Sequence, residues 1–380
     1  MIMSYWLTIE DFVLSVVISM GILGTAAVGV LQPPPMYVFR NSLLDVGSNN
    51  FLTVTNVPRA NMPYYDVLPA EINKLMAMEG FVMCLVISME VLSAAAAKKI
   101  GLAGSPPPYL SLALSSSLLV STALTIGMSY ASGGAGILNS TNAGNNIPLL
   151  KQVEYFDATR SKMVATVGSG AVRSRLARAF ILIGVAGNDL AAFYRSPAEQ
   201  QTDVAAFYGS LISNYSAAIT HLYTLGARKF GITNVGLVGC LPVNRQVLPD
   251  AAAGACSDAR NQLGAGFNDA LRNMLADLAN RLPAGFRYSL GDASSLMVDT
   301  FTDDPQVSAG FTDVADACCG GSRRVDCSPN STVCANRDQY YFWDAVHISQ
   351  EAAKQRAQAF YDGPAKYTTP ISFKKLLWSA

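Results

Sequence analysis

Short apolar runs alternate with long amphipathic segments along most of the chain. Four runs rich in branched and aromatic side chains end at polar or glycine-containing turns, and they predict buried strands at 36–39, 179–185, 230–238 and 286–290. Between them, apolar residues recur at helical spacing and predict helices over 150–178, 202–225 and 255–282. Strands alternating with helices are typical of a mostly parallel sheet covered on both faces, so the predicted fold class is a layered α/β fold.

Three apolar stretches raise the question of a membrane. The stretch 12–31 carries no charge and has small residues at 26–29, which favours a secretory signal peptide over residues 1–31. An N-terminal anchor is the alternative, because the stretch is long enough to span a bilayer and acidic residues precede it. The stretch 81–97 is interrupted by a glutamate. The stretch 100–150 is broken by prolines and serines, and we expect buried strand and loop there.

The charge composition narrows the class of protein. The 380 residues include 27 basic and 27 acidic side chains, with no run rich in lysine or arginine. The chain therefore lacks the excess of basic residues with which nucleic-acid-binding proteins contact phosphates, so no nucleic acid is expected as a partner. A multi-span membrane protein is a further alternative, but the amphipathic helices and the clustered cysteines favour an aqueous domain.

Cysteine placement is typical of an exported protein. Six of the seven cysteines lie in the last 150 residues or so and resemble disulfide partners: Cys240, Cys256, Cys318, Cys319, Cys327 and Cys334. Cys240 and Cys256 bracket a short loop, which suggests their pairing, whereas the other four leave three pairings open. Cys84 has no expected partner. A zinc cluster has few candidate ligands, because the chain lacks a Cys-x-x-Cys pair and contains only two histidines. Sequons at Asn139, Asn214 and Asn330 would carry glycans after export.

The two histidines define the candidate catalytic residues. In a parallel sheet the site lies beyond the carboxyl ends of the strands, and Ser42 follows the first predicted strand. His347 is the better candidate base, because Asp344 stands three residues before it and can hold the second ring N–H. A chance pair on a surface turn is the alternative for these two residues. His221 lies inside a predicted helix, where a surface or packing role is the default.

Donors for an oxyanion are also present. Gly187 and Asn188 follow the second predicted strand and can present backbone and side-chain N–H groups to a developing negative charge. Gly134 lies in a glycine-rich loop, 129–136, that can do the same. This loop is otherwise a flexible connection or a weak candidate for a phosphate cradle. The absence of a Gly-x-Ser-x-Gly elbow argues against an ordinary α/β-hydrolase.

Five motifs in order resemble those of the plant GDSL-type esterase/lipases of the SGNH hydrolase superfamily. They are the segment 38–50 with Ser42, the loop 130–137, Gly187-Asn188-Asp189, the paired segments 226–230 and 239–242, and Phe342-Trp343-Asp344 with His347. The similarity covers about 35–360 apart from one gap. It implies a three-layer α/β/α sandwich with a mostly parallel, flavodoxin-like sheet, forming a single domain over 35–365 before a C-terminal tail, 366–380.

The resemblance also implies roles for individual residues. Ser42 would be the nucleophile, His347 the base and Asp344 its orienting acid. Ser42 N–H, Gly134 and Asn188 would form the oxyanion hole. Members of the family are typically secreted to the cell wall or apoplast, glycosylated and disulfide-bonded, and they need neither a metal nor an organic cofactor. The expected partner is a small-molecule, lipid or polysaccharide ester, with membrane contact only through an uncleaved N-terminal segment.

Two departures from the family pattern define the alternative function. Arg40-Asn41 stand where the family has Gly-Asp before the serine, and we expect the long Arg40 side chain beside the position that an acyl oxygen must reach. The segment 66–97 diverges from the family and creates the gap. The first hypothesis is a secreted serine esterase or lipase. The alternative is a catalytically impaired SGNH scaffold that acts in binding.

Overall fold

The computed structural model describes only part of the chain. The described residues are 33–54, 97–102, 104–198, 201, 203–245, 255–282, 285–301, 310–320, 327 and 330–379. The expected signal peptide or anchor at 1–31, Cys84, for which no partner was expected, and nearly all of the divergent segment 66–97 lie outside these residues. Of the helices within them, none combines the length and the apolar character needed to cross a membrane.

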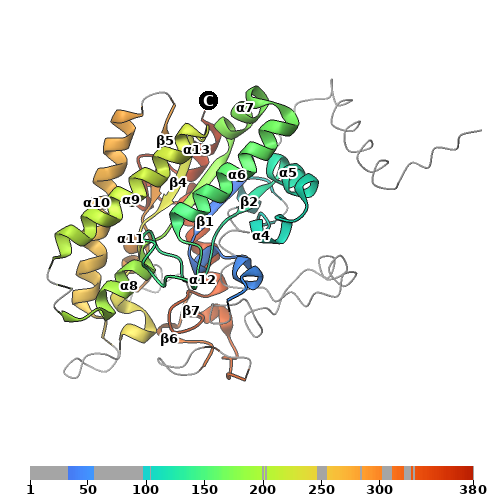
Figure 1. Cartoon of the computed structure of the whole chain (residues 1–380). Helices are drawn as coiled ribbons and strands as arrows, with labels where there is room; N and C mark the ends of the chain where they lie inside the picture. Colours follow the sequence, from blue (N-terminus) through green and yellow to red (C-terminus); the bar gives the residue numbers. More distant parts are fainter. Residues whose placement is uncertain are drawn as a thin grey trace, which may run out of the picture. The chain divides into compact units, whose positions relative to one another are not determined.

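The described part of the chain is built around a six-stranded sheet in the order β2-β1-β3-β4-β5-β8 (Figure 1). Neighbouring strands from β2 to β5 are parallel, and β8 pairs antiparallel with β5. The predicted α/β class with a mostly parallel sheet is confirmed. The strands are β1 Met36–Arg40, β2 Gly127–Ser129, β3 Phe180–Gly184, β4 Lys229–Thr233, β5 Arg287–Gly291 and β8 Thr368–Thr369.

The strand order determines where a site can form. The chain passes from β1 to β2 on one side and then returns to β3 on the other side of β1. The winding direction therefore reverses between β1 and β3, and in sheets of this kind the ligand crevice is expected beyond the carboxyl ends of these two strands. Ser42 follows β1 and Asn188 follows β3, so the topology brings both to this crevice.

The helices agree with the predicted pattern where it was strongest. The predicted helix 150–178 is divided in two at Gly168, whose φ of 83° lies in the left-handed region that favours glycine. Helix bounds are α4 Tyr109–Leu112, α5 Ser116–Thr125, α6 Leu149–Val167, α7 Ser169–Arg178, α8 Gly187–Arg195, α9 Val204–Thr224, α10 Asp258–Arg281, α11 Ala293–Thr300, α12 Gln350–Asp362 and α13 Phe373–Trp378.

Two sequence-based expectations about elements were wrong in part. The stretch 100–150, expected as buried strand and loop, also contains helices α4 and α5, and the serines Ser116, Ser117 and Ser121 lie inside α5 without interrupting it. The predicted strand 230–238 ends at Thr233, and its last residue begins the 3-10 turn η4, Val238–Cys240. An apolar run therefore continued past the end of a strand into a buried turn.

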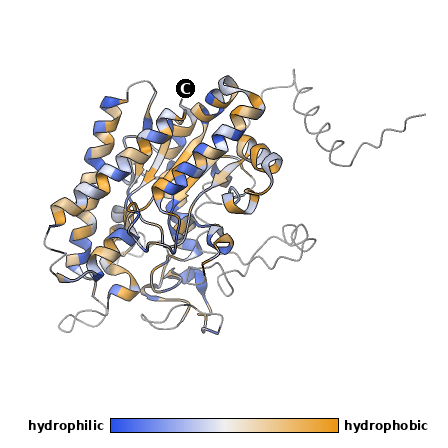
Figure 2. Cartoon of the chain, in the orientation of Figure 1, coloured by the Kyte–Doolittle hydropathy of each residue, from blue (hydrophilic) through white to orange (hydrophobic). Residues whose placement is uncertain are grey.

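Alternate side chains of β1 face two separate cores. Tyr37 and Phe39 pack with Phe156 of α6, with ring centroids 5.1 and 5.7 Å apart respectively. Met36 and Val38 belong to the opposite core, which α12 and α13 cover. Figure 2 shows the hydrophobic strands between helices that carry both hydrophobic and hydrophilic positions. The arrangement is the three-layer sandwich, and its sheet rim carries the site.

The segment after residue 365, indicated by the sequence only as a tail, contributes to the second core. It supplies β8 and α13, and Phe373, Leu376 and Leu377 of α13 are buried. Lys229 anchors the end of the helix, because its Nζ donates to the carbonyl oxygen of Leu377 over 2.7 Å. The C-terminal segment therefore covers one face of the sheet.

Disulfides hold the loops below the rim of the sheet. Within the described residues, Cys240 pairs with Cys256, which agrees with the suggested pairing. The four downstream cysteines form Cys318–Cys334 and Cys319–Cys327, so the structure selects one of the three open pairings. These two bonds lie beside a small sheet of β6, Asp313–Ala317, and β7, Tyr340–Phe342.

Candidate active site

Ser42 begins a short turn at the carboxyl end of β1. The strand ends at Arg40, and Asn41 has the extended backbone of a cap residue. The Asn41 side-chain oxygen accepts a hydrogen bond from Leu43 N over 3.2 Å. This cap starts the 3-10 turn η1, Ser42–Leu44, and places Ser42 at the crevice predicted by the strand order.

Asp344 and His347 share a tight turn that follows β7. Trp343 N donates to the carbonyl oxygen of His347 over 2.8 Å, which closes the turn. The Asp344 Oδ1 accepts hydrogen bonds from Val346 N and His347 N over 2.8 and 2.7 Å. Cys319 N, from the disulfide-bonded loop, donates to Trp343 O over 2.7 Å. The backbone thus orients both side chains before any substrate is considered.

The structure brings the serine and this pair together. Ser42 Oγ lies 2.9 Å from His347 Nε2, although the two residues are 305 positions apart in sequence. His347 Nδ1 lies 2.7 Å from Asp344 Oδ2. A nucleophile hydrogen-bonded to an imidazole whose other nitrogen contacts a carboxylate has the geometry of a catalytic triad.

Asp344 keeps its negative charge inside the protein. Burial acts to raise the pKa of this carboxyl, and the charge and hydrogen bond of His347 together with two backbone N–H groups act to lower it. The lowering contributions prevail, so the pKa lies below the ordinary value of an aspartate. An ionised Asp344 selects the imidazole tautomer that has its proton on Nδ1 and leaves Nε2 free to accept from Ser42.

A second buried carboxylate joins the serine turn to the glycine-rich loop. Asp45 Oδ1 accepts from Gly47 N and Ser48 N over 2.9 and 2.6 Å, and its Oδ2 accepts from Gly133 N over 2.7 Å. Burial raises the pKa of Asp45, and these hydrogen bonds offset part of that rise. No role for Asp45 was predicted from the sequence, although a carboxylate just after a buried strand was a usable signal.

Gly134 lies in the glycine-rich loop, and Asn188 lies in the first turn of helix α8, directly after β3. Asn188 Nδ2 donates to Ala135 O over 2.9 Å, and Gly134 has a φ of 81° that favours glycine. Ser132 N, in the same loop, donates to Arg40 O over 2.9 Å, so the loop runs beside the end of β1. The predicted oxyanion donors therefore come from segments that hydrogen bonds hold next to the serine turn.

Asp189, which was noted in the sequence without a role, fixes the glycine-rich loop to helix α8. Its Oδ2 accepts from Ile137 N over 2.8 Å, and its Oδ1 accepts from Thr141 Oγ1 over 2.7 Å. A side chain at Gly136 would collide with the Asp189 carboxylate, since an added Cβ would lie 2.4 Å from Oδ1. This contact requires glycine and holds the donor loop in place.

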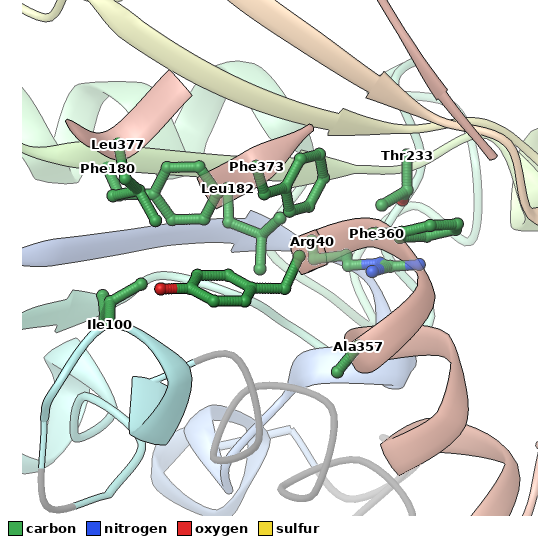
Figure 3. Close-up of a pocket in the computed structure, with 10 residues that line it drawn as sticks. Arg40, Ile100, Phe180, Leu182, Thr233, Ala357, Phe360, Phe373 and Leu377 are labelled. Carbon is green, nitrogen blue, oxygen red and sulfur yellow. The ribbon is translucent and has the colours of Figure 1, made fainter. Parts of the chain in front are cut away.

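The Arg40 side chain was expected beside the position of the acyl oxygen, and this expectation was wrong. Because neighbouring residues of a strand point to opposite faces, Arg40 lies on the same face as Met36 and Val38, over the second core. Its side chain lines a cavity with Phe360 and Thr233, among other residues, between the sheet and helices α12 and α13 (Figure 3). The guanidinium therefore points into the protein and away from the Ser42–His347 hydrogen bond.

The remaining histidine is far less suited to catalysis. His221 lies on α9 with 45% of its side chain exposed, and its Nε2 is 4.0 Å from Asp157. This agrees with the expected surface role. Among the residues that the structure describes, no three His, Cys, Asp or Glu side chains gather into a group that could hold a metal ion.

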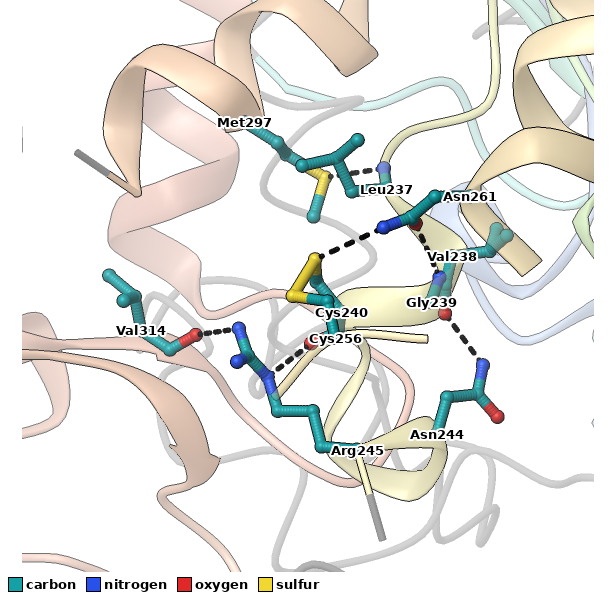
Figure 4. Close-up of a disulfide and its surroundings, with 10 residues drawn as sticks. All are labelled: Leu237, Val238, Gly239, Cys240, Asn244, Arg245, Cys256, Asn261, Met297 and Val314. Atoms are coloured by element: carbon teal, nitrogen blue, oxygen red, sulfur yellow. Dashed lines mark hydrogen bonds between the residues drawn. A yellow bond between two sulfur atoms is a disulfide. The ribbon is translucent and has the colours of Figure 1, made fainter. Parts of the chain in front are cut away.

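The loop after β4 supports the turn that carries Asp344. Around the Cys240–Cys256 disulfide, Asn261 accepts from Gly239 N over 2.8 Å, and Arg245 Nε donates to Cys240 O over 2.7 Å (Figure 4). Val243 N then donates to Ala345 O over 3.0 Å, directly beside Asp344. The disulfide-bonded segment thus connects the sheet rim to the acid of the triad.

Comparison with known proteins adds an independent observation. The family model described as GDSL-like lipase/acylhydrolase matches residues 90–360, a range that holds Asp344 and His347 and begins after Ser42. The GDSL esterase/lipase At5g37690 of Arabidopsis thaliana is 32% identical over 341 residues, covering 88% of this chain and 90% of that protein. The GDSL esterase/lipase At1g71250 of the same plant is 30% identical over 359 residues, covering 92% and 90%.

Proposed function

Because the chain belongs to the family of GDSL-like lipases and acylhydrolases and is thereby a carboxylic ester hydrolase, we propose that it works through a Ser42–His347–Asp344 triad. Family membership confirms the resemblance read from the motifs and establishes the reaction class. The residue roles are supported by the hydrogen-bonded order of serine, imidazole and carboxylate at the switch point of the sheet.

The proposed reaction has two acyl-transfer steps. His347 Nε2 accepts the proton of Ser42 Oγ as this oxygen bonds to the ester carbonyl carbon. The resulting oxyanion accepts hydrogen bonds from Ser42 N, the Gly134 backbone and Asn188 Nδ2. His347 returns the proton to the departing alcohol oxygen. A water molecule then attacks the acyl-serine by the same route and releases a carboxylic acid.

The single observation that carries the proposal is the 2.9 Å contact between Ser42 Oγ and His347 Nε2. The direction of Arg40 supports an active site over the impaired alternative, because its guanidinium does not enter the space around Ser42. Asn41 also keeps a useful role, since its amide caps the turn that presents the serine.

Steady-state hydrolysis of p-nitrophenyl esters of several acyl lengths tests the proposal. Ser42→Ala and His347→Ala are each expected to lower kcat by several orders of magnitude, because either change removes the nucleophile or its base. His221→Ala is the matched control and should keep wild-type rates. Wild-type rates in His347→Ala would contradict the assignment, and a folded wild type without any ester hydrolysis would support the impaired binding scaffold.

The proposal includes export from the cell. In the described residues, three disulfides are formed, a feature of proteins that mature in oxidising compartments. Asn139, the first residue of one sequon, is exposed. A signal peptide within 1–31 would direct the chain to the cell wall or apoplast, where lipid, polysaccharide and small-molecule esters are the candidate substrates.

A further inference from the structure

Gly133, in the glycine-rich loop, is held from both sides by the segment that follows the serine turn. Its N–H donates to Asp45 Oδ2 over 2.7 Å, and its carbonyl oxygen accepts from Asn49 Nδ2 over 2.9 Å. Asn49 lies in the 3-10 turn η2, Ser48–Phe51, and exposes 0% of its surface. Both backbone polar groups of Gly133 are therefore bound by side chains that come just after Ser42 in the sequence.

The hydrogen bonds around Asn49 fix which way its amide faces. Ile147 N can only donate, so Ser132 Oγ accepts from it over 2.9 Å and directs its own proton to Asn49 Oδ1, 2.5 Å away. The Gly133 carbonyl can only accept, so the amide nitrogen of Asn49 must face it. Ser132 also exposes 0% of its surface. The amide of Asn49 thus has one orientation, set by a buried network.

The hydrogen bond from Asn49 also determines the direction of the next N–H group. The peptide that joins Gly133 to Gly134 is trans and planar, so its carbonyl and its N–H point in opposite directions. With the Gly133 carbonyl on Asn49, the Gly134 N–H points away from Asn49. In the described part of the chain no backbone carbonyl accepts from Gly134 N, and Gly134 is partly exposed although Gly133 is buried. This N–H is the backbone donor that the proposed mechanism assigns to Gly134.

The glycine backbone alone does not hold this peptide in place. Gly134 has a φ of 81°, and half a turn of the peptide would carry this angle to about −100°, which glycine adopts as readily. The rotation would turn the N–H toward Asn49 and the Gly133 carbonyl oxygen away from it. A carbonyl oxygen in the place of the donor would repel an oxyanion. A contact outside the loop must therefore select the productive orientation.

We propose that Asn49 is a positioning residue for the oxyanion hole. Its amide nitrogen holds the Gly133 carbonyl, and this contact keeps the Gly134 N–H directed toward the substrate oxygen that develops negative charge. Because Asn49 is buried, it acts through this peptide, and Asp45 supports the same arrangement through Gly133 N. The inference rests on the proposed function, since the donor is needed only when Ser42 attacks an ester.

Asn49→Leu tests this role in the hydrolysis of p-nitrophenyl esters. Leucine keeps the branched shape of asparagine but cannot donate, so the peptide is released to rotate. We expect kcat to fall about 10²-fold with little change in KM, because the donor acts mainly on the charge of the transition state. A trifluoromethyl ketone, whose adduct with Ser42 carries an oxyanion, should bind this variant about 10²-fold more weakly than the wild type.

Asn268→Leu is the matched control. Asn268 of α10 exposes 5% of its surface, and its amide accepts from Val235 N over 3.0 Å and donates to Val235 O over 2.8 Å. Urea unfolding should show comparable losses of stability in the two variants, because each removes the hydrogen bonds of a buried amide. Asn268→Leu should nevertheless keep the wild-type kcat. An unchanged kcat in Asn49→Leu, or equal kcat losses in both variants, would overturn the positioning role.

Ser42→Ala separates this inference from the proposed function. If the wild type hydrolyses esters and Ser42→Ala does not, the function stands, and an unaffected Asn49→Leu rejects the positioning role alone. Hydrolysis that survives in Ser42→Ala, or that is absent from the folded wild type, would reject both.

A crystal structure of the wild type with the ketone supplies a readout that does not require any variant to fold. The adduct oxygen should lie within hydrogen-bond distance of Gly134 N, with the Gly133 carbonyl still on Asn49. An adduct oxygen bound away from Gly134 N, or a Gly133 carbonyl turned away from Asn49, would overturn the inference.

Discussion

At the scale of single residues, the site depends on carboxylates that hold other groups in position. Asp344 orients His347, Asp45 joins the serine turn to Gly133, and Asp189 fixes the glycine-rich loop to α8. Each carboxylate accepts at least one backbone N–H in addition to its main partner. Their hydrogen bonds are charge-assisted and directional, so they fix the geometry of the donors and the nucleophile.

Asp344→Asn tests the orienting role directly. The amide cannot stabilise the imidazolium and favours the wrong tautomer, so kcat should fall about 10⁴-fold with the fold retained.

The pH dependence of stability should also change in Asp344→Asn. The lowered pKa of Asp344 means that its ionised form stabilises the protein above the ordinary aspartate pKa, and that this contribution is lost as pH falls through the lowered value. Urea unfolding at several pH values from about 6 to about 2 measures this effect. The free energy of unfolding should fall less steeply with decreasing pH in the variant than in the wild type.

Asn188→Ala tests the oxyanion hole. Loss of one donor should lower kcat by about 10²- to 10³-fold with a small change in KM, because the hydrogen bond strengthens as charge develops on the oxygen. Asn142→Gly is the matched control, since the Asn142 amide also donates to the glycine-rich loop, at Gly134 O, but from an exposed position. A kcat loss equal in both variants would mean that Asn188 acts only by supporting the loop.

At the scale of elements, the strongly periodic segments were predictable and the short ones were not. The apolar pattern was sufficient to predict the long helices α6, α9 and α10 and the strands β1 and β3. Strand β2 falls in the stretch where buried strand was expected, although its three residues gave no bounds, whereas helix α5 escaped prediction because its ten apolar, serine and threonine residues give no clear period. The order of the motifs identified the candidate residues Ser42, Asp344 and His347. The inward direction of the Arg40 side chain could be known only from the pleat and register of the sheet.

The last helix, α13, supplies a stability prediction at this scale. Leu376 is fully buried against the sheet, and Leu376→Ala should lower the free energy of unfolding by about 2–5 kcal/mol through lost burial and a cavity. Lys374→Ala on the exposed side of α13 is the control and should change it by less than about 1 kcal/mol. Denaturant unfolding measures both, and equal small effects would show that α13 does not stabilise the domain.

At the scale of the whole molecule, two kinds of connection converge on the site. The parallel sheet brings loops from β1 and β3 to one crevice, and the disulfide-bonded C-terminal region delivers Asp344 and His347 to the same place. The sequence could indicate the sheet and the cysteine cluster separately. The sequence could not show that Cys318 pairs with Cys334. Cys318 and Cys319 are adjacent, and only the folded backbone shows which partner each side chain points toward.

Export leads to a prediction about glycan sites. Asn139 is exposed, whereas Asn214 is half-buried within α9, where its amide donates to Ser210 O over 2.9 Å and the next residue, Tyr215, is buried. Secretion from a plant or yeast host should therefore give glycan at Asn139 and none at Asn214. Peptide mapping after enzymatic deglycosylation measures both positions, and occupancy confined to Asn214 would contradict the exposure argument.

Fluorophosphonate labelling of the folded chain, followed by mass-spectrometric mapping of the modified residue, tests whether Ser42 is an activated nucleophile. The reagent reacts with an activated serine and requires no knowledge of the natural ester. We expect modification of Ser42 in the wild type and in His221→Ala, and loss of this modification in His347→Ala. Modification of another serine, or unchanged labelling of Ser42 in His347→Ala, would contradict it.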